Sequence, residues 1–124
     1  MLDMKILLCD DSMLVRKKLK GSLEAHGFTN VLEAVDGEEA VAVCLAEKPE
    51  LVLMDIVMPK KDGIAALQEI KQAEPATHVV MASSVGTQSN LIQARKLGAS
   101  NFLQKPVSAE AIVEIAAGIA KERG

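Results

Sequence analysis

The sequence contains no tryptophan and no tyrosine, and only two phenylalanines among its 124 residues. Proteins that bind single-stranded nucleic acid stack the bases on aromatic rings, which this chain almost lacks. There is also no excess of positive charge, because 14 Lys and Arg stand against 17 Asp and Glu and give a net charge of −3. Both deficits argue against direct binding to nucleic acid or to an anionic membrane surface.

Cysteine is scarce as well. Cys9 lies in an apolar run of strand character and Cys44 in a helical pattern, and no CxxC motif or Cys/His cluster accompanies them. We therefore expect two buried free thiols in a reducing compartment rather than a zinc site or a disulfide framework. Long apolar runs are missing too: the run at 6–9 stops at Asp10, short of a signal-peptide core or a membrane span. The sequence thus predicts a cytoplasmic protein without a membrane segment.

What the chain does contain is an alternation of short apolar blocks and longer amphipathic segments. The blocks at 6–9, 51–54 and 79–82 are continuously apolar, which is typical of strands buried on both faces of a parallel sheet. Two weaker blocks, at 31–35 and 101–104, have the mixed character of edge or flanking strands. Five strands are therefore expected.

Five helical patterns separate and follow these blocks. Each has a plausible start or stop signal: Gly27 and Gly98 as stops, and Asp36-Gly37, Gly63, Thr87 or Ser89, and Ser108 as starts. Five βα units in a row predict a single α/β domain, residues 1–124, with helices on both faces of a parallel sheet.

Polar residues follow four of the predicted strands, where an open α/β sheet binds its ligands. They are Asp10 and Asp11, Asp55, Ser83 and Lys105. Two carboxylates ~4 Å apart repel by roughly 4 kcal/mol at an effective dielectric of 20. Either one stays protonated, or a divalent cation and a lysine compensate, and oxygen ligands favour Mg²⁺ over zinc. The set predicts Mg²⁺-dependent phosphoryl transfer onto an aspartate, with Lys105 and Ser83 as partners of the phosphoryl group.

Taken singly, each of these residues has an ordinary structural explanation. Asp10 or Asp11 could be the N-cap of the helix that follows, Asp55 and Ser83 could be loop residues, and Lys105 could be a solvated charge. Only their joint placement at four strand ends favours a reactive site.

In these motifs the chain resembles the response-regulator receiver domains of two-component signalling, and most of all the stand-alone CheY-like chemotaxis proteins. The segments that carry the resemblance span nearly the whole chain, in order: 7–12, 53–59 with 62–63, 81–84, 98–99 and 102–106. The resemblance implies a doubly wound five-stranded parallel sheet of order 2-1-3-4-5 with five helices, the flavodoxin/CheY-like fold.

The resemblance also implies a phosphoacceptor and a metal site. Asp55 would accept the phosphoryl group from a phosphohistidine of a sensor histidine kinase. Asp11 and Asp55 would bind Mg²⁺ directly and Asp10 through water, with the backbone carbonyl of Val57 as a further ligand.

A conformational switch is implied in the same way. Lys105, followed by a cis bond to Pro106, would pair with a phosphoryl oxygen. Ser83 would move to hydrogen-bond the phosphoryl group, and Phe102 would turn inward into the vacated space. Phe102 stands where some chemotaxis members have Tyr, so a phenol hydroxyl is not available to a partner.

Three signalling functions remain open. The first is a stand-alone module that binds a target through its fourth helix, last strand and fifth helix, which in chemotaxis would be the flagellar motor switch. The second is a phosphorelay intermediate that serves a histidine phosphotransfer protein, and the third is the receiver of a larger regulator with an output domain. In each case the chain is not an enzyme with a separate substrate, because it catalyses only its own phosphorylation and dephosphorylation.

Two enzyme or cofactor classes fit less well. A flavodoxin-like protein would need a phosphate-binding loop after the first strand, where Asp10 and Asp11 would repel phosphate, and aromatics beyond Phe28 and Phe102. An aspartyl-phosphate hydrolase would have a second Asp at position 12, which is Ser12.

Two apolar residues predict that a phosphorylated form would dephosphorylate itself slowly. Val57 and Val85, each two residues after a site residue, cannot position a hydrolytic water. A phosphoryl half-life of only seconds without a phosphatase would contradict this expectation.

Overall fold

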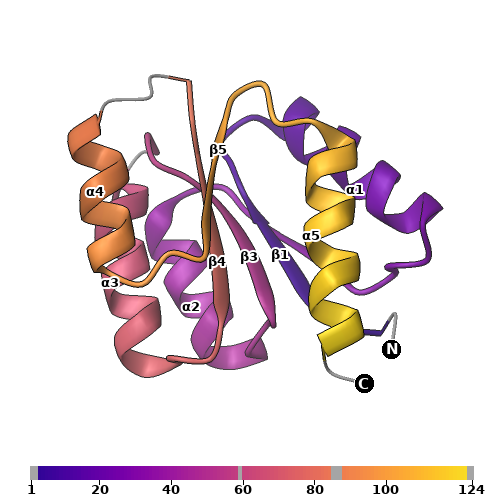
Figure 1. Cartoon of the computed structure of the whole chain (residues 1–124), viewed down its shortest axis with the longest axis horizontal. Coiled ribbons are helices and arrows are strands. Elements are labelled where there is room, and N and C mark those ends of the chain that lie inside the picture. Colours follow the sequence, from indigo (N-terminus) through magenta and orange to yellow (C-terminus); the bar gives the residue numbers. More distant parts are fainter. Residues whose placement is uncertain (1–2, 59, 85–87, 123–124) are drawn as a thin grey trace.

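A computed structural model describes residues 3–58, 60–84 and 88–122. Strands and helices alternate strictly along the chain (Figure 1). Their bounds are β1 (Ile6–Cys9), α1 (Met13–Ala25), β2 (Val31–Ala34), α2 (Gly37–Glu47), β3 (Leu51–Asp55), α3 (Gly63–Ala73), β4 (His78–Ser83), α4 (Gln88–Lys96), β5 (Asn101–Gln104) and α5 (Ala109–Glu122).

The five strands form one parallel sheet in the order β2-β1-β3-β4-β5. The predicted order is thus confirmed, and the two weaker apolar blocks are the edge strands β2 and β5. The chain leaves β1 toward one edge and returns to β3 on its other side. The carboxyl ends of β1 and β3 therefore border the point where strand order reverses, which is where such sheets bind ligands.

Helices cover both faces of the sheet. In Figure 1, α1 and α5 lie on one side and α2, α3 and α4 on the other. Alternate residues of a buried strand enter the two cores: Ile6 and Leu8 pack with α1 and α5, whereas Leu7 and Cys9 pack with α2 and α3. Because both faces are buried, these strands are continuously apolar instead of alternating.

Side-chain caps begin the first three helices. The cap of α1 is Ser12, whose Oγ accepts from the N–H of Val15 at 3.3 Å, so neither Asp10 nor Asp11 serves as that cap. Asp36 caps α2, accepting from the N–H of Glu39 at 2.8 Å. Glu39 accepts in turn from the N–H of Val35 at 3.1 Å, which completes a capping box. Asp62 caps α3, accepting from the N–H of Ala65 at 2.8 Å.

The glycine stops predicted from the sequence are confirmed. Gly27 and Gly98 follow α1 and α4 with φ of 93° and 99°, a region that favours glycine. Ser108 Oγ accepts from the N–H of Ala111 at 3.4 Å at the start of α5. Ser89 lies inside α4 and does not cap it, and Thr87 lies outside the described residues.

Both cysteines are buried and free, as predicted. Burial raises the pKa of Cys44 to about 12, so its thiol is protonated and inert at neutral pH. In the described part of the chain, none of the helices combines the length and apolar character needed to cross a bilayer.

Candidate functional site

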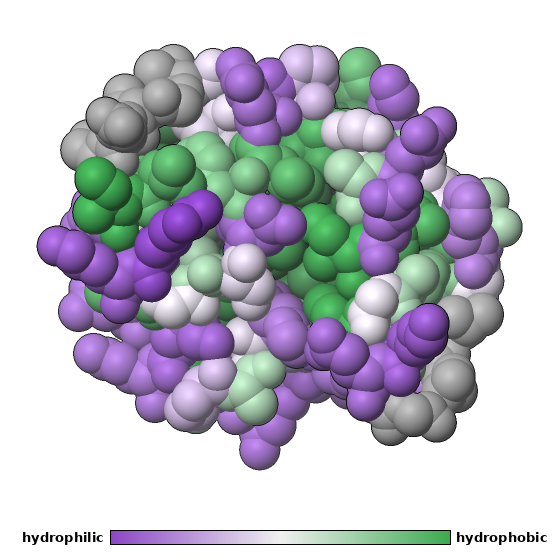
Figure 2. Space-filling view, viewed as in Figure 1, coloured by the Kyte–Doolittle hydropathy of each residue, from purple (hydrophilic) through white to green (hydrophobic). Residues whose placement is uncertain are grey.

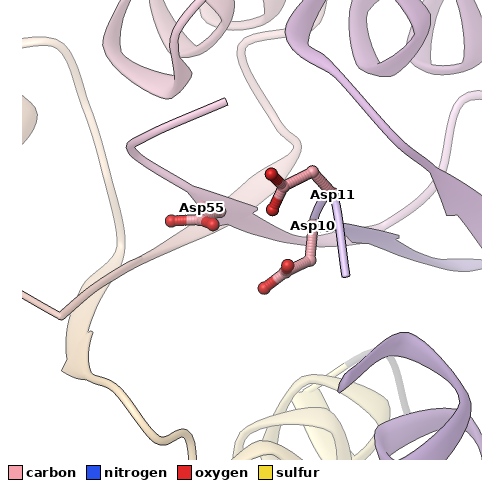
Figure 3. A group of neighbouring side chains, drawn as sticks. All are labelled: Asp10, Asp11 and Asp55. Carbon is pink, nitrogen blue, oxygen red and sulfur yellow. The ribbon is translucent and has the colours of Figure 1, made fainter. Parts of the chain in front are cut away.

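Three carboxylates meet at the reversal point of the sheet. Asp10 and Asp11 directly follow β1, and Asp55 is the last residue of β3 (Figure 3). Each offers an oxygen that lies within 4.8 Å of the oxygens of the other two. Asp10 and Asp55 are buried, whereas Asp11 is exposed. The cluster is thus half enclosed, with its open side at Asp11.

Lys105 joins two of these carboxylates. Its Nζ lies 2.8 Å from Asp10 Oδ2 and 2.8 Å from Asp55 Oδ2. The loop that carries it is tied to β4, because the N–H of Lys105 donates to the carbonyl of Ser83 at 2.8 Å. The peptide bond between Lys105 and Pro106 is cis, as the resemblance implied.

The second oxygen of each buried carboxylate is held by main chain. Asp10 Oδ1 accepts from the N–H of Ser12 at 2.9 Å, and Asp55 Oδ1 accepts from the N–H of Val57 at 3.3 Å. Each carboxylate is therefore oriented by one lysine contact and by the amide two residues further along. Asp11, by contrast, makes no side-chain hydrogen bond to any residue that the structure describes.

Burial and neighbouring charges shift the pKa values of Asp55 and Lys105 in opposite directions. Burial raises the pKa of Asp55 above its ordinary value, and the hydrogen bond and charge of Lys105 offset only part of that effect. Burial alone would lower the pKa of Lys105, but its hydrogen bonds to Asp10 and Asp55 raise it. Lys105 therefore stays positively charged, whereas the ionisation of Asp55 costs free energy in the folded protein.

This cost predicts that Asp55→Asn stabilises the metal-free fold. Because the pKa of Asp55 is raised on folding, its ionisation destabilises the fold increasingly as pH rises from the unfolded-state pKa through the folded-state pKa. We expect the melting temperature at pH 7 with a chelator to rise by a few degrees, which for this size corresponds to about 1 kcal/mol. Thermal melts followed by circular dichroism test this, and the gain should shrink in acid. A variant that melts at or below the wild-type temperature at pH 7 would contradict it.

The chain approaches itself closely behind Asp55. The N–H of Gly63 donates to the carbonyl of Ile56 at 2.8 Å, and the N–H of Ile56 donates to the carbonyl of Ala82 at 3.0 Å. A Cβ placed on Gly63 would lie 2.1 Å from the carbonyl oxygen of Asp55. The absence of a side chain at Gly63 therefore lets α3 begin directly against the end of β3.

The donor set suits a hard divalent cation. The group that the described residues form consists of three carboxylates, one of them exposed, and includes no histidine or thiol. Oxygen ligands of this kind suit Mg²⁺, which binds through one or two carboxylates and keeps several waters. The residues present therefore fit a magnesium site.

The remaining predicted residues occupy different places. Ser83 ends β4, is buried and lies beside the Lys105 backbone. Phe102 lies within β5, paired with Met81, and packs against the core that faces α4. The Val57 side chain is exposed. Val85 lies outside the described residues.

Sequence reasoning missed Arg16. Its side chain is buried in α1, where it donates to the carbonyl of Asp10 at 2.7 Å and to Glu33 at 2.9 Å. The signal was present, because Arg16 shares the buried stripe of α1 with Leu19 and Leu23, a position where a charge needs a partner.

Comparison with known families matches residues 6–117 to the response regulator receiver domain. The chain belongs to the response-regulator receiver family. Its relatives are signalling proteins, and the family expected from the strand-end motifs is confirmed.

Receivers of chemotaxis are among the most similar proteins. The chemotaxis protein CheY of Bacillus subtilis (strain 168) is 42% identical over 110 residues, which cover 89% of this chain and 92% of that protein. The crystal structure of a CheY-like receiver domain protein from Methanospirillum hungatei JF-1 has a TM-score of 0.91 at 25% identity, covering 97% of this chain and 95% of that one.

A third relative was crystallised with a metal. The CheX-CheY-BeF3-Mg+2 complex from Borrelia burgdorferi contains a chain with a TM-score of 0.86 and 30% identity, covering 94% of this receiver and 88% of that chain. That complex contains Mg²⁺ and BeF3.

Proposed function

We propose that this receiver accepts a phosphoryl group on Asp55 from a phosphohistidine of a sensor histidine kinase, in a Mg²⁺-dependent reaction. The observation that carries the proposal is the buried Asp55 carboxylate, 2.8 Å from Lys105 and beside the carboxylates of Asp10 and Asp11. Asp10 shares the burial, the lysine contact and the two neighbouring acids, so among the described carboxyls these features single out Asp10 and Asp55, and the resemblance to receiver domains assigns the acceptor role to Asp55.

The metal would be held by Asp11 and Asp55 directly, by Asp10 through water and by the backbone carbonyl of Val57. When bound, Mg²⁺ offsets the negative charge of the cluster and polarises the phosphoryl oxygens.

The chain's own residues perform the transfer. A bond forms between phosphorus and a carboxylate oxygen of Asp55 while the bond from phosphorus to the imidazole nitrogen of the donor breaks, and that nitrogen keeps the electron pair. Lys105 exchanges a carboxylate contact for one to a phosphoryl oxygen. The Ser83 hydroxyl donates to another oxygen.

Phosphorylation would then change the surface formed by α4, β5 and α5. Figure 2 shows apolar side chains gathered between α4 and α5, over β4 and β5, with polar residues around them. Phe102 lines a groove on this face together with Leu91 and Arg95. Because Lys105 and Ser83 adjoin the ends of β5 and β4, a change in their contacts can shift the population of Phe102 conformers and so partner binding. In chemotaxis the partner on this face would be a flagellar motor switch protein.

The apolar rim of the site is also compatible with a second function, phosphorelay. Met13 and Leu14 on the first turn of α1 and Val57 after β3 are exposed, with 78% exposure at Leu14 and 72% at Val57. Exposed apolar side chains at this edge suit docking of a helical phosphodonor or a histidine phosphotransfer protein. This rim serves kinase and phosphotransfer protein alike, so it supports both functions.

Intact mass after incubation with acetyl phosphate tests the proposal. We expect the mass of one phosphoryl group on the wild type with Mg²⁺ and no adduct on Asp55→Asn or with a chelator. Glu38→Gln, which neutralises an exposed carboxyl on α2, is the matched control and should be phosphorylated like the wild type. Absence of an adduct on the wild type under every condition would overturn the proposed chemistry.

A further inference from the structure

Arg16 is a buried cation outside the acidic cluster. Its residue is 8% exposed, and its guanidinium makes two directed contacts. Nη1 donates to the carbonyl oxygen of Asp10 at 2.7 Å, and Nε donates to Glu33 Oε1 at 2.9 Å. Removing a guanidinium from water is costly unless its donors are satisfied. The burial of Arg16 is therefore sustained by partners on two different strand segments.

The contact with Asp10 acts on the main chain where β1 ends. The N–H of Asp10 still donates to the carbonyl of Ala34 at 3.2 Å, so the β1–β2 ladder reaches this residue. The carbonyl of Asp10 accepts a hydrogen bond from the Arg16 side chain, and this bond replaces the next strand-to-strand hydrogen bond. The peptide group that Arg16 holds is the one between Asp10 and Asp11.

The position of the Asp11 carboxylate depends on this peptide group more than the positions of the Asp10 and Asp55 carboxylates do. The carboxylates of Asp10 and Asp55 are each fixed by Lys105 and by a backbone amide. The Asp11 carboxylate has no such contact among the described residues, so the main chain that carries it is the part of the structure that positions it.

We infer that Arg16 is a positioning residue for Asp11: by holding the Asp10–Asp11 peptide, it sets the affinity of the acidic cluster for a divalent cation. The inference rests on the proposed function, in which Asp11 is a direct ligand of Mg²⁺. Hydrogen-bond partners that orient metal ligands contribute about 10–100-fold to metal affinity in other sites.

The effect of Arg16 is one of geometry more than of charge. Glu33 lies against the guanidinium, and Lys20 Nζ approaches the other Glu33 oxygen at 3.7 Å. Glu33 therefore offsets part of the charge of Arg16, while Lys20 shares the same carboxylate. An ammonium group in its place would keep the charge but lose the planar fork that reaches Asp10 and Glu33 together.

Two variants and one control test this. Arg16→Gln removes the charge and the fork, Arg16→Lys removes only the fork, and Lys17→Gln makes the same charge change at an exposed position on the same helix. Mg²⁺ alone is titrated into each variant of the 124-residue chain by calorimetry, without any phosphodonor. We expect the dissociation constant to rise about 10-fold for Arg16→Gln and by most of that factor for Arg16→Lys, which also loses the fork, and to stay unchanged for Lys17→Gln.

Phosphoryl uptake from acetyl phosphate provides a second readout. At saturating Mg²⁺, the rates of both Arg16 variants should return to within about twofold of wild type, because positioning of a ligand alters affinity first. A general loss of stability would not separate the two quantities in this way.

Three outcomes would overturn the inference. One is a Mg²⁺ affinity of the Arg16 variants equal to that of Lys17→Gln, and another is a reduced maximal rate with unchanged affinity. The third is that both Arg16 variants fail to fold by circular dichroism, which would assign Arg16 to stability. Failure of the proposed function has a different signature, since the wild type itself would then bind no Mg²⁺ or gain no phosphoryl group.

Discussion

Lys105→Gln is expected to slow phosphoryl uptake by about 100-fold at saturating Mg²⁺, since the loss of one preorganised donor for developing charge costs this much in other active sites. The physical reason is the position of Nζ, 2.8 Å from both Asp10 and Asp55, where it is preorganised for a phosphoryl oxygen. Initial rates of uptake from acetyl phosphate, followed by intact mass, measure the effect.

The pH dependence of uptake should change in the same variant. Lys105 lowers the pKa of Asp55 against the stronger effect of burial. Without the lysine the pKa of Asp55 rises further, so a smaller fraction of the nucleophile is ionised at a given pH, and the acid limb of the rate profile moves to higher pH.

A matched lysine separates local from general charge effects. Lys18 is exposed on α1 and lines the same small pocket as Lys105, but no contact to the acidic cluster is seen for it in the described part of the chain. Lys18→Gln should keep the wild-type rate and profile. Equal rates for the two variants would remove Lys105 from its proposed role.

Gly63→Ala is expected to destabilise the fold by about 3 kcal/mol or more, the upper range for overpacking. The added Cβ would lie 2.1 Å from the carbonyl oxygen of Asp55 and 2.8 Å from the Cα of Ile56. Both are main-chain atoms, so relief requires a shift of β3 or of the whole start of α3. The free energy of unfolding of a single domain is about 5–15 kcal/mol, so the expected loss is a large fraction of it.

Urea denaturation followed by circular dichroism measures this loss, since the chain has no tryptophan. Gly118→Ala in α5 is the control, because a Cβ there meets nothing within 4 Å. Alanine replaces glycine in a helix with a gain of up to about 1 kcal/mol, so the two variants should change stability in opposite directions. Similar effects at both positions would show that the close approach at Gly63 is tolerated.

Much of the fold could be read from the sequence because its signals are local. A continuously apolar block such as 6–9 states that both faces of its strand are buried, and Gly27 and Gly98 mark helix ends through their own backbone conformations. The candidate site was predictable for a related reason. In a parallel sheet all carboxyl ends lie at one edge, so Asp55 and Lys105 were expected at the same edge of the sheet.

Other features depended on long-range contacts that no local pattern specifies. Asp10 and Asp11 were the candidates for the cap of α1, but Ser12 caps that helix, and the Asp10 carboxylate contacts Lys105, on a loop that is distant in the sequence. Arg16 belongs to an amphipathic stripe whose other buried members are apolar, and only the docking of α1 beside β2 supplies Glu33 as its partner.

The sequence by itself determined the order of strands and helices, the parallel sheet and the gathering of acids and a lysine at one edge, because periodicity and strand ends are encoded residue by residue. The tertiary structure alone decided which side chains pair there. It paired Asp10 and Asp55 with Lys105, left Asp11 exposed, and placed Arg16 behind the Asp10–Asp11 peptide. Those contacts follow from strand register and helix docking, which bring together residues that are far apart along the chain.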